Sequence, residues 1–295
     1  MSTLTLLALT GIGLGGLYFL VASGLALIFG LMRVLNFAHG AFLLLGGYVA
    51  WLVGVHLAGA TATVSNLQFA AMLAAALAAG AAIGTLTELV LIRPLYRREV
   101  AQVLVTVGLT LVVGALVAGI WGADPHTLPV PGWVRSTTHV LGAEVPNSRF
   151  LLIGTALGVL AALLLFLRHT RYGVIVRAGV ENRIMVSALG IDVRRAFTLV
   201  FALGGAAAGL GGALAGVYFG AVSPALGTTL LIDAFIVVVI GGLGSITGTA
   251  IAALAVGLLQ QFANYYVTGV GDLAIVLLLA VVLLVRPRGR LGTAT

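Results

Sequence analysis

Long apolar runs separated by short polar segments constrain the fold of this chain more than any other feature. A membrane-spanning helix needs about 20 mostly apolar residues, and only two of the runs, Thr229–Ile240 and Leu273–Val285, fall well short of that length. The others are Thr5–Leu31, Val34–Ala60, Leu67–Ile92, Val100–Gly122, Phe150–Leu167, Ala196–Gly220 and Ile246–Asn264. The sequence therefore predicts an all-α fold, a polytopic transmembrane helical bundle of about eight to ten spans, some of them broken or re-entrant.

The composition indicates a single membrane domain over residues 1–295. Apolar residues make up 61% of the chain and charged residues 8%, and the mean hydropathy is +1.21. Soluble domains carry roughly a quarter charged residues. The run from Thr5 to Leu31 has no basic residue before it and is too long for a signal-peptide core, so we expect it to be a retained span.

The arginines predict how the spans are oriented. All 15 basic residues are arginines, and 13 of them fall in every second loop, whereas only Arg135 and Arg149 fall in the loops between. Because cytoplasmic loops are enriched in basic residues, we expect residues 93–98, 168–195 and 286–290 to be cytoplasmic and the loop 123–149 to be extracytoplasmic. The pattern favours about nine crossings with the C-terminus inside. Arginines between apolar runs act as topology signals of a protein in a lipid bilayer, and no nucleic-acid partner is expected.

Metal and thiol chemistry are not expected. The chain has no Cys, and its five His are scattered without an H-x-x-x-H pair.

Small residues recur at every fourth position of the sixth run. One face carries Ala208, Gly212, Gly216 and Gly220, and an adjacent face carries Gly205, Gly209 and Ala213. Such spacing lets helices approach closely. It suits either tight packing or a helix that slides against its neighbours, and we favour packing because the spacing is common in membrane bundles.

The basic segment 168–195 contains a predicted short amphipathic helix. Its apolar positions are Val180, Ile184, Met185, Ala188 and Leu189. Glu181 suits the first turn, and Gly190 is placed to end the helix. Such a helix lies on lipid headgroups or docks in a groove of a cytoplasmic partner, and the pattern alone does not decide between them.

Three motifs in this order resemble the branched-chain amino-acid permeases of ABC importers. The run Asn36-Phe37-Ala38-His39-Gly40-Ala41, with Gly46-Gly47-Tyr48 after it, is similar to the second-segment signature of that family. The stretch from Glu181-Asn182-Arg183 to Gly190-Ile191-Asp192 resembles its cytoplasmic coupling segment, although the general importer pattern begins Glu-Ala-Ala. Asp233-Ala234-Phe235 and the run Val238–Thr249 resemble its C-terminal signature. Urea and short-amide importers look similar.

The resemblance implies a permease subunit of an ATP-driven importer in the inner (plasma) membrane of a prokaryote, and not an enzyme. It implies two ATP-binding cassette ATPase subunits, a second permease chain that is a paralogue or a copy, and an extracytoplasmic substrate-binding protein. No cofactor is expected on this chain, since ATP would be bound by the partner subunits, and the sequence has no G-x-x-x-x-G-K-[ST] phosphate loop. The implied contact with the ATPase is made by Glu181, Arg183, Ile184, Met185, Leu189 and Gly190.

The substrate class follows from the scarcity of fixed charges. Such a pathway does not favour a strongly charged solute, so we expect a small, largely apolar amino acid; the resemblance implies branched-chain amino acids, or close analogues such as urea or short amides. The alternative is a self-contained secondary carrier or channel for a small neutral solute, with the broken segments as its site. Ion-driven carriers usually hold several intramembrane charges, whereas only Glu88 and Asp233 lie well inside apolar runs here.

Two broken segments are the candidate translocation pathway. The predicted residues are Asn36, His39 and Gly40 in the first, and Asp233, Gly241, Gly242, Gly244, Ser245 and Thr247 in the second. Asn36 and His39 would satisfy freed backbone groups or gate the pathway, and we favour the first role. Asp233 would brace its broken helix, and Glu88 would snorkel or pair locally with Arg93. We expect Gly241–Ser245 to be non-helical and buried, with the Ser245 or Thr247 hydroxyl satisfying freed backbone groups.

Overall fold

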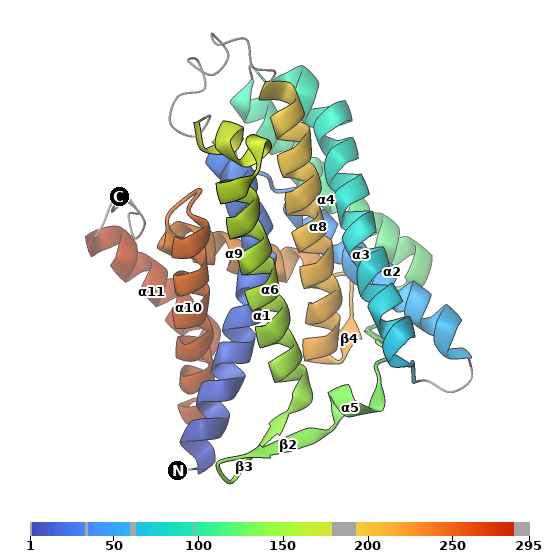
Figure 1. Cartoon of the computed structure of the whole chain (residues 1–295), viewed down its shortest axis with the longest axis vertical. Coiled ribbons are helices and arrows are strands. Elements are labelled where there is room, and N and C mark those ends of the chain that lie inside the picture. The colour runs from blue at the N-terminus through green and yellow to red at the C-terminus, as the bar shows by residue number, and fades with distance from the viewer. Residues whose placement is uncertain (1, 33–34, 60–62, 97, 179–192, 286–295) are drawn as a thin grey trace.

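A computed structural model describes residues 2–32, 35–59, 63–96, 98–178 and 193–285 of this protein (Figure 1). Within this part of the chain, seven helices are long and apolar enough to cross a membrane, and two shorter apolar helices, α9 (Leu226–Gly241) and α11 (Gly271–Val285), accompany them. The long helices are α1 (Ser2–Met32), α2 (His39–Ala58), α3 (Asn66–Leu86), α4 (Glu99–Trp121), α6 (Asn147–His169), α8 (Val193–Phe219) and α10 (Ile246–Tyr266). The predicted all-α polytopic bundle is therefore confirmed.

The helices α2 and α3 differ from the predicted runs in their backbone conformation. The helix α2 begins at His39 rather than at Val34, because residues 35–38 are non-helical. The helix α3 continues beyond Leu86 as a π-helix, η2 (Thr87–Ile92), and then as a 3-10 turn, η3 (Arg93–Leu95). Apolar runs show where a helix can form, but they do not distinguish its hydrogen-bond period or its last turns.

The helices α1 and α8 form the centre of the bundle. The helix α1 packs against α6, α8, α9 and α10, and α8 packs against α1, α2 and α3. The glycines of α8 allow this: a Cβ atom on Gly205 would lie 2.2 Å from the Gly80 carbonyl oxygen of α3, and one on Gly212 would lie 1.9 Å from that of Leu43 in α2. The small-residue spacing therefore serves tight packing, the interpretation that we favoured from the sequence.

Short strands shape the end of the bundle that holds the N-terminus of α1. They are β1 (His126–Thr127), β2 (Thr137–Val140), β3 (Ala143–Pro146) and β4 (Ala221–Val222), with the short helix α5 (Gly132–Arg135) before β2. The strands β2 and β3 form an antiparallel hairpin, and β1 pairs with β4, so that His126 lies opposite Val222. The sequence does not predict these strands, because strands of two to four residues are too short for a periodic pattern.

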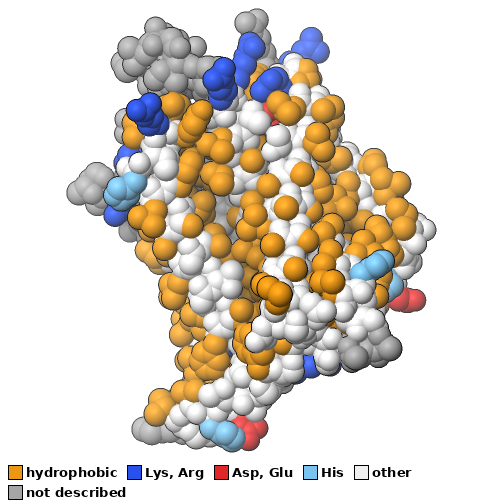
Figure 2. All heavy atoms as spheres, turned by 45° about the vertical axis from the view of Figure 1, so that its right-hand side comes forward, with side chains coloured by type: hydrophobic (Ala, Val, Ile, Leu, Met, Phe, Trp, Pro, Cys, Tyr) orange, Lys and Arg blue, Asp and Glu red, His pale blue; other side chains and the backbone are white. Residues whose placement is uncertain are grey.

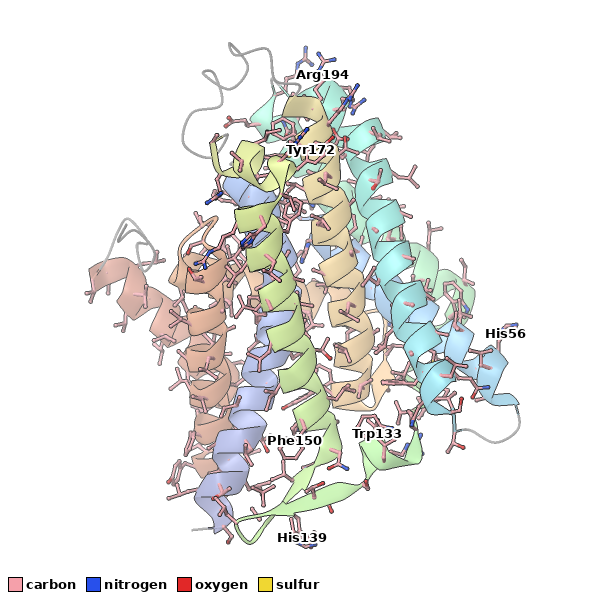
Figure 3. The ribbon with its side chains drawn as sticks, viewed as in Figure 1. His56, Trp133, His139, Phe150, Tyr172 and Arg194 are labelled. Atoms are coloured by element: carbon pink, nitrogen blue, oxygen red, sulfur yellow. The ribbon has the colours of Figure 1, made fainter. Side chains whose placement is uncertain are left out.

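Charge is distributed unevenly between the two ends of the bundle. Figure 2 shows most of the visible basic side chains gathered at one end. Figure 3 places Arg194 and Tyr172 at that end, and Trp133 and His139 at the opposite one. In the described part of the chain, Arg194 thus lies at the end of the bundle opposite to the polar segment before α6.

Candidate translocation site

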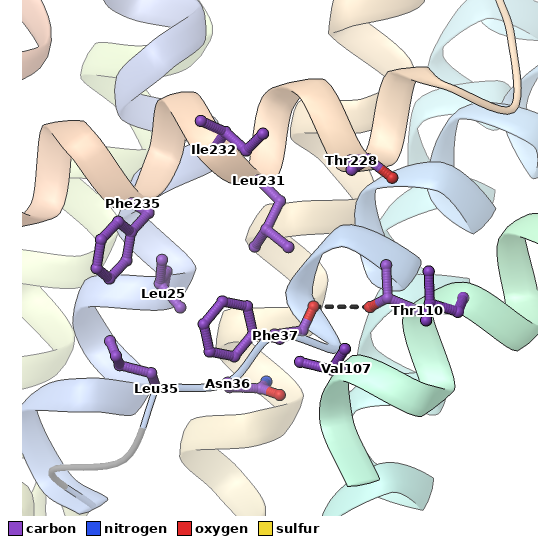
Figure 4. Close-up of a pocket in the computed structure, with 11 residues that line it drawn as sticks. Leu25, Leu35, Asn36, Phe37, Val107, Thr110, Thr228, Leu231, Ile232 and Phe235 are labelled. Carbon is purple, nitrogen blue, oxygen red and sulfur yellow. Dashed lines mark hydrogen bonds between the residues drawn. The ribbon is translucent and has the colours of Figure 1, made fainter. Parts of the chain in front are cut away.

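The first break in the bundle lies at residues 35–38, between α1 and α2 (Figure 4). Two threonines of α4 hold it: Thr106 Oγ1 accepts a hydrogen bond from the Phe37 N–H at 3.3 Å, and Thr110 Oγ1 donates to the Phe37 carbonyl at 2.7 Å. Asn36 is buried, and its Oδ1 accepts from the Ala38 N–H at 3.1 Å. A backbone N–H or C=O group without a hydrogen-bond partner is costly inside a bilayer, so these three side chains stabilise the irregular backbone. Asn36 therefore has the bracing geometry that we favoured from the sequence.

His39 anchors the start of α2 on α1. Its buried Nε2 lies 2.7 Å from the carbonyl oxygen of Val21. A carbonyl oxygen only accepts, so Nε2 carries the proton and donates it. Gly24 of α1 makes room for the ring, since a Cβ there would lie 2.9 Å from His39 Cε1. His39 thus packs against helix backbone and is not among the residues that line the pocket beside this break.

The second break lies at residues 242–245, between α9 and α10. Gly242 and Gly244 have φ angles of 93° and 87°, which side chains rarely tolerate. Ser245 caps α10 by accepting from the Gly248 N–H at 3.1 Å, and its own carbonyl accepts from Thr249 Oγ1 at 2.7 Å.

Two details of this break differ from the expectation. Gly241 is the last residue of α9 and therefore helical, so the non-helical segment is one residue shorter than predicted. The break is also only partly buried, because Leu243 is 47% exposed even though Gly244 packs against Gly30 of α1. Thr247 is exposed and its hydroxyl lies 3.5 Å from that of Ser245, so the capping group is Ser245. The first difference is one residue at a helix end, and the second depends on which neighbours cover the loop.

A pocket of about 320 Å³ adjoins the first break (Figure 4). It lies where the break meets α1, α4 and α9. None of its lining residues is ionisable; they are Leu25, Leu35, Asn36, Phe37, Val107, Thr110, Leu111, Thr228, Leu231, Ile232 and Phe235. This volume is at the small end of the range for small-molecule sites, and the walls suit an apolar, uncharged group.

The structure separates the residues that the sequence placed in one pathway. Only Asn36 lines this pocket, while Gly40 packs against the Gly227 carbonyl of α9. Gly244 instead lines a smaller cavity of about 230 Å³ with Gly30 and Arg177. The two breaks therefore contact different parts of α1.

Asp233 lies beside a polar cluster between helices and not in the pocket. The Tyr18 hydroxyl of α1 donates to Gln260 of α10, and Gln260 Nε2 donates to Asp272 of α11 at 2.7 Å. Asp233 of α9 interacts electrostatically with Asp272 and with Tyr18. Asp233 does not line the pocket, and its bracing of the broken helix stays a prediction.

Thr106 and Thr110 are site residues that sequence reasoning missed. They are four positions apart in the apolar run Val100–Gly122, and this spacing puts them on one helix face. That signal is visible in the sequence, but nothing in it shows that the face meets Phe37.

The predicted coupling residues, from Glu181 to Gly190, lie outside the described residues. Among the residues that the structure does describe, no group of three or more His, Cys, Asp or Glu side chains is arranged to hold a metal ion.

The fold and the site together define a multi-pass helical membrane protein of the permease class, with irregular backbone held inside the bundle by side chains. Residues 7–286 match the family described as "Branched-chain amino acid transport system / permease component", and the chain belongs to that family. The resemblance seen in the three sequence motifs is therefore confirmed.

The relatives cover nearly the whole chain. It is 30% identical to the high-affinity branched-chain amino acid transport system permease protein LivH of Salmonella typhimurium, over 96% of this chain and 93% of that protein. It is 29% identical to BraD of Pseudomonas aeruginosa, a permease protein of the same description, over 96% and 94%. It is also 28% identical to the ribose import permease protein RbsC of Escherichia coli, over 83% and 74%. No solved structure matches the chain.

Proposed function

We propose that this chain is the membrane-spanning subunit of an ATP-driven importer that moves branched-chain or other small apolar amino acids into the cytoplasm. The observation that carries the proposal is the family match over residues 7–286, combined with a sequence that has no Lys and therefore no phosphate-binding loop of its own. ATP would be bound by two partner ATPases, and a second permease chain and an extracytoplasmic binding protein would complete the importer.

The pocket beside the first break supports the substrate class. Its walls are aliphatic and aromatic, and the polar side chains among them are uncharged. Transfer of an aliphatic side chain from water into such a site is favourable, whereas a charged side chain would lose its hydration and find no group of opposite charge there. Urea and short amides remain candidate substrates, and ribose joins them because RbsC is similar.

The orientation of the proposed importer follows from the arginines. The end that carries Arg194 would face the cytoplasm, together with the C-terminus, and the hairpin of β2 and β3 would face the binding protein outside the inner membrane.

Uptake by reconstituted complexes tests the proposal. The tagged chain is purified with its partners, which are identified by mass, and reconstituted in liposomes that contain ATP. We expect ATP-dependent uptake of labelled leucine, isoleucine or valine, with no competition from excess urea, acetamide or ribose. Uptake of the same solutes by liposomes that hold this chain alone, without ATP, would instead establish a secondary carrier or channel.

The predicted coupling helix gives a second test. Buried apolar anchors usually carry most of the binding energy of an interface, and charges at its rim tune it. We therefore expect Met185→Asp or Leu189→Asp to abolish ATPase binding or to uncouple hydrolysis from uptake, and Glu181→Ala or Arg183→Ala to have weaker effects. If both aspartate variants bind the ATPase and keep substrate-stimulated hydrolysis, this segment rests on lipid.

A further inference from the structure

A buried carboxylate joins α3 to α8 at the arginine-rich end of the bundle. Glu88 is fully buried at the start of the π-helix η2. Its Oε2 accepts a hydrogen bond from Thr198 Oγ1 of α8 at 2.7 Å, and its Oε1 accepts one from the Tyr96 hydroxyl. The Arg93 Nε lies 3.5 Å from Oε1, and Arg93 Nη2 donates to Thr198 Oγ1 at 3.2 Å. Glu88 thus pairs locally, as expected, and also reaches a helix 110 residues further along the chain.

The groups around this carboxylate supply it with hydrogen-bond donors and a positive charge. Tyr96 packs edge-on against Phe197 of α8, with ring centroids 5.2 Å apart. Burial raises the pKa of the Tyr96 phenol, and the hydrogen bond to Glu88 raises it further, so Tyr96 remains a donor. A carboxylate without these donors would be costly to bury. The contacts therefore hold only when α8 lies at one height relative to η2.

The interface between α3 and α8 brings the two helix backbones close together. It is lined by glycines in close backbone contact: a Cβ on Gly84 would lie 2.4 Å from the Phe201 carbonyl oxygen, and one on Gly80 would lie 2.1 Å from that of Gly205. Large side chains that interdigitate hold two helices in register, but glycine surfaces are smooth. The hydrogen bonds of Glu88 therefore add directional contacts that fix the axial position of one helix relative to the other.

The hydroxyl of Thr198 has a second acceptor within its own helix. The Arg194 carbonyl oxygen lies 3.1 Å from Thr198 Oγ1, compared with 2.7 Å for Glu88 Oε2. A hydroxyl donates one proton. If a shift of α8 separates Thr198 from Glu88, the Thr198 hydroxyl can donate instead to the Arg194 carbonyl oxygen of its own helix. The contact can thus be broken without leaving an orphaned donor on α8.

We propose that Glu88 is a positioning residue that locks the axial register of α8 against α3. A displacement imposed on the N-terminal end of α8 then moves α3 with it. This inference rests on the proposed function, because the displacement would come from ATP binding by the partner subunits. A purely structural ion pair would change stability alone, whereas a register lock sets how much solute is moved per ATP.

The ratio of ATP hydrolysed to amino acid taken up, measured on the full complex in liposomes, tests the lock. Glu88→Gln keeps the volume but removes the charge and one acceptor, and Thr198→Val removes the bridging hydroxyl. We expect both variants to assemble and to raise the ratio about tenfold or more, the loss typical of a hydrogen bond to a charged group. Thr198→Ser should restore the ratio, and Glu99→Gln, at an exposed acid of the first turn of α4, should leave it unchanged.

Further measurements separate the lock from folding and from the proposed function. Spin labels at Leu86→Cys on α3 and Leu199→Cys on α8 are feasible because the chain has no Cys. We expect ATP to leave their distance unchanged in the otherwise wild-type complex and to shift or broaden it in Glu88→Gln. The lock is overturned if Glu88→Gln and Thr198→Val keep the wild-type ratio, or if uptake falls only in proportion to folded protein. Absence of ATP-dependent uptake by the wild-type complex would instead refute the proposed function.

Discussion

A single methyl group at Gly212 should separate two helices of the bundle. Gly212 lies where α8 crosses α2, and an added Cβ would meet the Leu43 carbonyl oxygen at 1.9 Å, its carbonyl carbon at 2.7 Å and its Cα at 3.1 Å. All three atoms are helix backbone, so no rotamer change relieves the clash. Ordinary contact begins at 3.4 Å, so the helices must move apart locally by roughly 1.5 Å, the difference between 3.4 and 1.9 Å.

The cost of this separation has two parts. Overpacking a tight interface typically costs about 1–3 kcal/mol, and a gap of about 1 Å already removes up to about half of the dispersion energy of the atoms that line it. The contacts of Gly209 with Ala76 and of Gly205 with Gly80 lie on the same helix and would be strained as well. We therefore expect Gly212→Ala to destabilise the protein by about 3 kcal/mol.

Gly114 supplies the matched control. It lies in α4, and a Cβ there would have no neighbour within 4 Å. Alanine is favoured over glycine within a helix by up to about 1 kcal/mol, so Gly114→Ala should be neutral or stabilising. Reversible unfolding of the purified chain in mixed detergent and SDS micelles measures both variants. If Gly212→Ala proves as stable as Gly114→Ala, the close approach of α2 and α8 is not what holds the bundle.

Three further predictions concern topology and the two breaks. A cysteine at the exposed Ser136 should react with an impermeant thiol reagent in intact cells, because of the arginine distribution; reaction only after permeabilisation would reverse the topology. Replacing both Gly242 and Gly244 with Leu should abolish transport but leave insertion intact, since both have positive φ angles; normal transport would show that the break is mere flexible packing. Thr106→Val together with Thr110→Val should leave the Phe37 N–H and carbonyl without hydrogen-bond partners, destabilise the protein by about 1–3 kcal/mol for each group, and lower uptake. The control is Thr155→Val, which loses only a hydrogen bond within its own helix. If the double variant is as stable as this control, the bracing role is contradicted.

The helices could be predicted from the sequence because of the solvent around them. Lipid offers no hydrogen bonds, so an apolar run of sufficient length must satisfy its own backbone as a helix. The Gly-rich break could also be located, because three of the five residues 241–245 are glycines, and glycine tolerates the positive φ angles that Gly242 and Gly244 adopt. Sequence reasoning predicted a broken segment at Asn36, His39 and Gly40 but not the start of α2 at His39, because the hydrogen bonds of Thr106 and Thr110 to Phe37 come from another helix.

Local sequence determined the class of this protein, the segregation of its arginines and the helix face on which its small residues lie. Those properties depend on composition and on the helical period, and both can be read along one chain. Only the tertiary structure decided which groups meet: Glu88 with Thr198, Phe37 with Thr110, and Tyr18 with Gln260. A helical pattern shows the direction in which a side chain points but not the neighbour that it finds, because that neighbour is chosen by the packing of helices far apart in the chain.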